Sequence, residues 1–207
     1  MGPGTITDVE QLRALYRPPN PRAAGKVRSS VDAASARLIA RCPLVLMSTA
    51  DEDGRCDVSP RGGPPGFVKL LDDRHVAVPD MGGNNRLDSS VNIVTNRHAG
   101  LLFVVPGKDE TLRINGPAWL TTNADVLDRT QNPRLRRSKM AVVVETAELF
   151  AHCAKAFRRG RVWDPGSWED LADAPDLAEI YACQFGGDAD GYRSVLADSY
   201  AQSLAGD

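Results

Sequence analysis

A glycine- and amide-rich segment, residues 79–95, holds the side chains best suited to bind an anion. It reads PDMGGNNRLDSSVNIVT and directly follows the β-branched run HVAVP (75–79). Its glycines allow positive φ and a close backbone approach, and N–H groups at the start of the following helix favour negative charge. The guanidinium of Arg86 can bind a phosphate through two hydrogen bonds. The segment predicts either a phosphate-binding loop or a turn in which Asn84 or Asn85 caps the helix.

Two other segments place a cation on a constrained backbone. The loop DVSPRGGPPGF (57–67) contains three prolines and three glycines around Arg61, so its backbone is rigid. The segment ETLRING (110–116) reads as a strand whose alternation directs Thr111 and Arg113 to the same face. The first segment is either a stiff connection or part of a ligand site, and the second is either a solvated face or the lining of such a site.

Two basic segments follow later in the chain. CAKAFRRGRVW (153–163) combines Lys155 and Arg158 with the aromatic Trp163, and PRLRRSK (133–139) is the most basic loop. The first predicts a solvated basic surface or a contribution to a ligand site. The second predicts a solvated loop before the last strand, with the rim of a substrate mouth as the alternative.

Taken together, these motifs carry a family likeness. The runs DVSPRGGPPGFVKLLDDRHVAVPDMGGNNRLDSSVNI, GLLFVVPG and ETLRINGPAWLTT resemble flavoproteins of the pyridoxamine 5′-phosphate oxidase-like group. More narrowly, they resemble its bacterial FMN-dependent subgroup with DVSPRG-PPGF and GNNR motifs. The likeness covers about residues 30–165. It implies a mainly β (α+β) fold, an antiparallel split β-barrel with flanking helices, and a homodimer with FMN sites at its interface.

The resemblance also implies roles for individual residues. Family members hold the FMN phosphate with an arginine–lysine pair, and here Arg86 falls at the arginine while Leu87 replaces the lysine. Asn84 and Asn85 are therefore expected to help bind the phosphate. The other predicted cofactor-binding residues are Arg61, Val68, Lys69, Pro79, Asp80, Thr111, Arg113, Lys155, Arg158 and Trp163, the last three as candidates for the second subunit's contribution.

The chain departs from pyridoxamine phosphate oxidases where those enzymes bind their substrate. The Y-x-x-x-R-x-x-x-S pattern is replaced by LDRTQNPRLRRS (127–138), and the terminal R-L-H-D-R by RRGRVWDP (158–165). We therefore expect a small-molecule substrate other than a vitamin B6 phosphate.

The predicted function is an FMN-dependent oxidoreductase that transfers hydride through its flavin. No catalytic residue is identified, because the cofactor supplies the redox chemistry. One alternative is a flavin-binding module without turnover, such as a carrier, store or redox sensor. The other is a relative that binds deazaflavin F420 or haem. His152 is the candidate ligand for haem.

Composition excludes several other classes. A net charge of −2 argues against nucleic acid and anionic membranes as partners. Three scattered histidines and four cysteines without a C-x-x-C pair predict no metal site and reduced thiols. The chain shows no apolar run of about 20 residues and no signal peptide. These features predict a cytoplasmic protein.

The elements that must position these residues are predicted from periodicity. Short links between most of the strands exclude parallel crossovers there, which favours an antiparallel barrel or sandwich with helices at its ends. The predicted strands are 43–50, 55–59, 67–71, 75–79, 99–106, 111–122 and 140–153. The predicted helices are 7–16 with Thr7 as cap, 29–42, 85–95, 123–131 with Asn123 as cap, and a tail from about 168, while prolines exclude a helix in 17–25.

Three regions are expected along the chain. Residues 1–28 form an N-terminal helix and linker, residues 29–165 form the FMN-binding split-barrel domain, and residues 166–207 form a helical extension.

Overall fold

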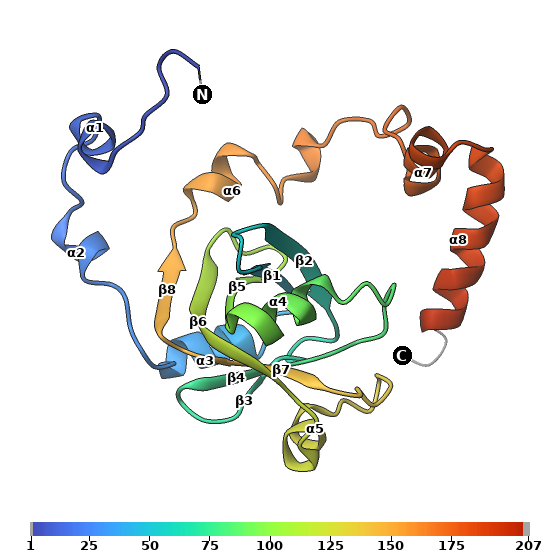
Figure 1. Ribbon diagram of the computed structural model, residues 1–207, viewed down its shortest axis with the longest axis horizontal. Coiled ribbons are helices and arrows are strands. Elements are labelled where there is room, and N and C mark those ends of the chain that lie inside the picture. Colours follow the sequence, from blue (N-terminus) through green and yellow to red (C-terminus); the bar gives the residue numbers. More distant parts are fainter. Residues whose placement is uncertain (1, 205–207) are drawn as a thin grey trace.

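The computed structural model describes residues 2–204, and its centre is an eight-stranded antiparallel sheet curled into a split barrel (Figure 1). The strand order is β2-β1-β5-β6-β7-β4-β3, and β8 also pairs with β6. All pairs are antiparallel, which confirms the predicted fold class. The strands are β1 (Leu44–Ala50), β2 (Cys56–Gly62), β3 (Lys69–Leu70), β4 (His75–Pro79), β5 (His98–Val104), β6 (Thr111–Thr121), β7 (Ala141–Glu145) and β8 (Glu148–His152).

The strand predicted at 140–153 is instead two strands, and Gly116 explains where it divides. The first half of β6 pairs with β8, and its second half pairs with β7. Between the two halves, a β-carbon on Gly116 would lie 1.9 Å from the carbonyl oxygen of Glu145. The N–H of Ala147 donates to the carbonyl of Asn115 (3.1 Å) at this crossing. The chain passes here from one half of the barrel to the other.

The barrel interior is filled by alternating side chains of its central strands. α4 (Asp88–Asn96) packs against β1 and β2, where Asn92 Nδ2 donates to Thr49 Oγ1 (3.0 Å). Ile93 of the same helix joins the core. α4 thus extends the barrel core, with its first turn beside β2. The fully buried residues of β1, β5 and β6 are Val45, Met47, Leu101, Phe103, Leu112 and Ile114.

The helices outside the barrel correct two predictions. Asp8, not Thr7, caps the first helix, because its side chain accepts from Gln11 N–H (2.8 Å). The prediction of no helix in 17–25 is wrong, since Pro21 occupies the first helical position, where no N–H is required. Asn123 caps α5 as predicted. The other helices are α1 (Val9–Ala14), α2 (Pro21–Ala24), α3 (Ala33–Ile39), α5 (Ala124–Thr130), α6 (Lys155–Arg159), the 3-10 helix η1 (Pro165–Ser167), α7 (Leu177–Phe185) and α8 (Ala189–Leu204).

Two arms extend from the barrel on opposite sides in Figure 1. The N-terminal arm, residues 2–28, carries α1 and α2, and the C-terminal arm, residues 166–204, carries α7 and α8. α7 and α8 pack on each other through Tyr181 and Tyr192, whose rings meet edge to face at 5.8 Å. Within residues 2–204, no helix has the length and apolar character needed to cross a membrane.

Candidate functional site

A cleft of about 650 Å³ opens beside the first turn of α4. It brings together five of the predicted site residues, Arg61, Asp80, Asn84, Asn85 and Arg86. Arg61 comes from β2, Asp80 follows β4, and the other three precede α4. The remaining lining residues are Asp57, Ser59, Pro60, Met81, Gly82, Gly83, Leu87, Asp88, Ser89, Ser90, Arg136, Arg137, Ser138 and Lys139.

The first turn of α4 has no side-chain cap. Its N-cap residue is Leu87, which adopts a left-handed conformation (φ 62°), and no side chain among the described residues accepts from the first-turn N–H groups. Asn85 is also left-handed (φ 59°). Such conformations cost a non-glycine residue about 1–2 kcal/mol, and they turn successive N–H groups toward one side, where an anion can bind. The helix begins at Asp88 rather than near Asn85, so the alternative reading of this segment, in which Asn84 or Asn85 caps the helix, is wrong.

A hydrogen-bond network ties this helix start to β2. Ser89 Oγ donates to Asp57 Oδ2 (2.6 Å), accepts from Arg61 Nη2 (3.0 Å), and lies 3.0 Å from Ser59 Oγ. Arg61 also faces Asp80, at 3.7 Å between Nη1 and Oδ1. Its Nε atom is buried and has no hydrogen-bond partner among residues 2–204. Arg61 is therefore held in place at the cleft with hydrogen-bonding capacity left for a ligand.

Arg86 lies in the loop before the helix rather than in its first turn. Its Nε donates to Asp88 Oδ2 (2.7 Å), and this hydrogen bond raises the pKa of the guanidinium. The side chain is 71% exposed. Because Asp88 already balances its charge, the position of Arg86 does not by itself require a bound anion.

Asp80 is the carboxyl group in the cleft whose surroundings most disfavour its charge. Burial raises its pKa above the ordinary value of 3.8, although Arg61 and Lys139 act in the opposite direction. The cofactor-free fold therefore binds the Asp80 proton more tightly than the unfolded chain does, so the ionised form opposes folding above the raised pKa.

Replacing Asp80 with asparagine should stabilise the cofactor-free protein at neutral pH. The gain over wild type should be full above the raised pKa and should vanish as the pH falls through it toward 3.8. Urea unfolding of both proteins at about pH 7 and about pH 4 measures this difference. The exposed Asp73→Asn variant is the control. A gain that is equal at both pH values would contradict the burial of an unfavourable charge.

The basic loop 133–139 contributes four consecutive residues to the cleft, from Arg136 to Lys139. Arg137 Nη2 is ion-paired with Asp128 Oδ1. Arg134, in the same loop, does not line the cleft. The placement fits the alternative reading of this loop as a rim, rather than a purely solvated connection.

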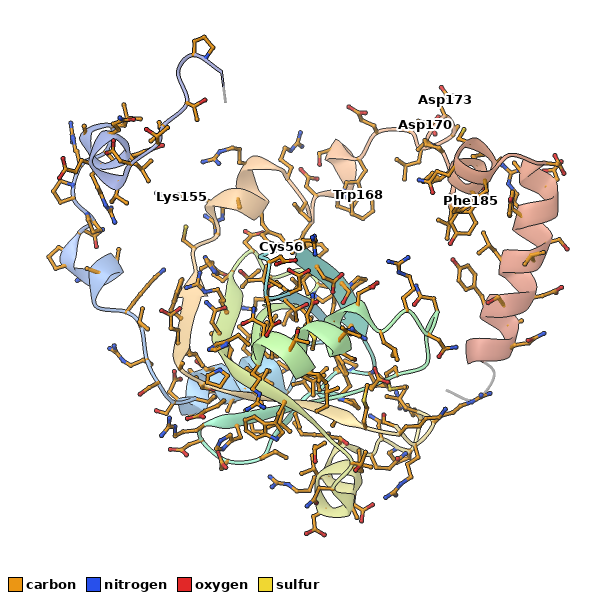
Figure 2. The ribbon with its side chains drawn as sticks, viewed as in Figure 1. Cys56, Lys155, Trp168, Asp170, Asp173 and Phe185 are labelled. Atoms are coloured by element: carbon orange, nitrogen blue, oxygen red, sulfur yellow. The ribbon has the colours of Figure 1, made fainter. Side chains whose placement is uncertain are left out.

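The other predicted residues lie outside the cleft of one chain. Val68 and Thr111 are buried, Lys69 is in β3, and Pro79 is the buried end of β4. The guanidinium of Arg113 packs on the Phe150 ring, 4.0 Å from its centroid, and pairs with Glu148. In and after α6, Arg158 pairs with Asp109, and Trp163 Nε1 donates to the Lys108 carbonyl (2.8 Å). Lys155 is exposed on α6 (Figure 2).

Sequence reasoning identified Arg61 but missed three polar residues of its network, Asp57, Ser59 and Ser89. Asp57 and Ser59 alternate with Arg61 along β2 and share its face, a period that the sequence displays. Ser89 carries no comparable signal, because its partners lie about 30 residues away in the chain.

The comparison with protein families assigns the fold to a family. The model of the pyridoxamine 5′-phosphate oxidase family matches residues 31–155, more than half of the chain. The chain belongs to this family. The match covers the barrel and the whole cleft, and it ends before the C-terminal arm begins. No curated protein sequence matches the chain.

Solved structures of similar fold include two bacterial proteins that are each 19% identical to this chain. HupZ from Group A Streptococcus is 19% identical, with 56% of this chain and 89% of that chain covered and a TM-score of 0.47. A putative pyridoxamine 5′-phosphate oxidase from Lactobacillus delbrueckii is 19% identical, with 60% and 98% covered and a TM-score of 0.46. Others are named as an FMN-binding protein, an F420 reductase, an FAD binding protein and a haem storage protein. At these identities and scores, the likenesses identify no ligand for this chain.

Proposed function

We propose that the protein is an FMN-dependent oxidoreductase whose cleft holds the FMN phosphate at the start of α4. The observation that carries the proposal is the uncapped first turn of α4, which begins at a left-handed Leu87 within the cleft. Unpaired N–H groups at a helix start are suited to a phosphate. Left-handed conformations of non-glycine residues concentrate at ligand sites.

The charge of the cleft supports the same ligand. Its lining includes five cationic side chains and three carboxylates, whereas the whole chain has a net charge of −2. A concentration of positive charge in an acidic protein favours an anionic ligand. The cations are Arg61, Arg86, Arg136, Arg137 and Lys139, and the carboxylates are Asp57, Asp80 and Asp88.

The residues around the α4 start fit a phosphate group. Arg61 and Arg86 would supply guanidinium donors, and Asn84 and Asn85 would supply amide donors. Bound FMN would provide hydride transfer with a small-molecule substrate. The chain's own residues bind and orient the cofactor. The basic residues of loop 133–139 leave a second positive region on the cleft for an anionic group of the substrate.

The predicted residues outside the cleft are best explained by a cytoplasmic homodimer with FMN at its interface. Thr111, Arg113, Lys155, Arg158 and Trp163 would then act at the partner's site. The outward face of β1, β2 and β5 supports such an interface, because Leu46, Val58 and Leu102 share it and remain partly or largely exposed.

The absorption spectrum of the purified protein and the mass of the chromophore released on denaturation test the cofactor. We expect FMN at about one per chain, because each chain has one such helix start in its cleft. Released F420 or haem would replace FMN in the proposal. No histidine lines the described cleft, which disfavours haem. Bleaching of the bound flavin by NAD(P)H would separate an enzyme from a binding module without turnover.

A further inference from the structure

The N-terminal arm is fully exposed although it has a defined conformation. Every residue from 2 to 30 is exposed, including Val9, Leu12, Leu15 and Tyr16, which form an apolar group in and just after α1. An isolated helix shorter than about 12 residues is marginal in water, and α1 has six residues. A surface outside the single chain would therefore stabilise this arm.

The C-terminal arm presents a complementary exposed surface. Its α7–α8 pair is held together internally, since Arg193 of α8 forms ion pairs with Asp176 and Glu179 at the start of α7. Outside that contact, the arm exposes large apolar side chains. Trp168, Leu171 and Phe185 are 62%, 72% and 71% exposed. Figure 2 labels Trp168 and Phe185 along this arm, far from α1.

The two arms have opposite charge. Residues 1–28 contain five basic and two acidic residues, whereas residues 166–207 contain nine acidic residues and one basic residue. The same difference in charge is found among the charged side chains of each arm that form no ion pair. Among residues 2–204, no ion pair involves Arg13 or Arg17 of the first arm, nor Asp170 or Asp173 of the second.

We propose that the arms are exchanged in a homodimer, so that the basic N-terminal arm of one copy docks on the acidic C-terminal arm of the other. Within one chain the arms lie on opposite sides of the barrel (Figure 1). A two-fold axis would form both arm contacts at once, because each copy carries both surfaces. The inference rests on the proposed homodimer and is independent of the cofactor.

The alternative position for the acidic arm is the basic cleft of its own chain. At that cleft Arg136 Nη2 donates to the carbonyl oxygen of Gln202 (3.4 Å). An arm placed there would leave the exposed N-terminal arm uncovered. Exchange between copies accounts for both arms.

Charge reversal in trans tests the exchange. One chain carries Arg13→Glu and Arg17→Glu, and the other carries Asp170→Lys and Asp173→Lys. Each variant alone should show a dimer dissociation constant raised about tenfold at low salt, because two exposed attractions at each arm contact become repulsions. An equal mixture should recover wild-type affinity, since both arm contacts are complementary in the mixed dimer. Sedimentation velocity measures all three samples.

A double reversal of two exposed arginines in and just after α3, Arg37→Glu with Arg41→Glu, is the matched control and should leave the dimer unchanged. Reversed arms that dimerise as tightly as this control would overturn the inference. So would a mixture that shows no recovery, because contacts within one chain are not repaired by mixing. A monomeric wild type would overturn it too, while flavin bound by that monomer would leave the cofactor proposal intact.

Discussion

Replacing Arg61 with alanine should weaken FMN binding about 100-fold. Hydrogen bonds to charged groups contribute about 1.5–3 kcal/mol each, and a factor of 100 corresponds to about 2.7 kcal/mol. Arg61 is expected to contribute to FMN binding in two ways. Its guanidinium faces the cleft with a buried Nε that has no described partner, and its Nη2 holds Ser89 in the first turn of α4. Titration of the apo protein with FMN, followed by flavin fluorescence, gives the dissociation constant.

Alanine variants of two other arginines provide comparisons for the dissociation constant of Arg61→Ala. Arg134 lies in the basic loop but does not line the cleft, so Arg134→Ala should change the FMN dissociation constant less than about twofold. Arg86→Ala should have an intermediate effect, because its side chain is 71% exposed and already paired with Asp88. Equal, small effects of Arg61→Ala and Arg134→Ala would contradict the phosphate site at α4. Unfolding by urea would confirm that the variants remain folded.

The sequence predicted the antiparallel barrel because its signals are local. Turn residues between β-branched runs specify the β1–β2 and β5–β6 hairpins, and both form. The phosphate segment was also found locally, from glycines and amides beside an arginine. Its helix start was misplaced by about three residues. Asn85 and Leu87 adopt left-handed conformations that extend the loop. Asparagine favours this conformation among non-glycine residues, but leucine does not, so Leu87 gives no sign of it in the sequence.

The parts of the site that could not be predicted from the sequence depend on contacts between residues far apart in the chain. Asp57 and Ser89 meet across more than 30 residues of chain. The basic loop 133–139 reaches the same cleft only because β7 pairs with β4, which places Lys139 near Asp80. Neither pairing leaves a pattern in the sequence of either segment. The charge of the two arms, in contrast, is plain in the composition, although their separation is evident only in the fold.

The division of the predicted last strand into β7 and β8 also depends on a contact with a distant segment. The run AVVVETAELF reads as one continuous strand, and nothing in its own sequence breaks it. Its two halves separate because β6 turns from β8 to β7 at Gly116. The cause therefore lies in another strand, about 30 residues earlier, and in the absence of a single carbon atom there.

Replacing Gly116 with alanine should consequently lower the free energy of unfolding by about 3 kcal/mol, the upper range for forcing an extra carbon into a packed site. The new β-carbon would lie 1.9 Å from the Glu145 carbonyl oxygen and 2.9 Å from the Ala147 nitrogen, both backbone atoms. A side chain could rotate away, but these atoms can move only if the crossing between the barrel halves opens. Urea unfolding of the cofactor-free protein measures the loss. Gly82→Ala is the control, because its β-carbon would meet nothing within 4 Å. If the two variants were equally stable, the close crossing at Gly116 would not be what divides the strand.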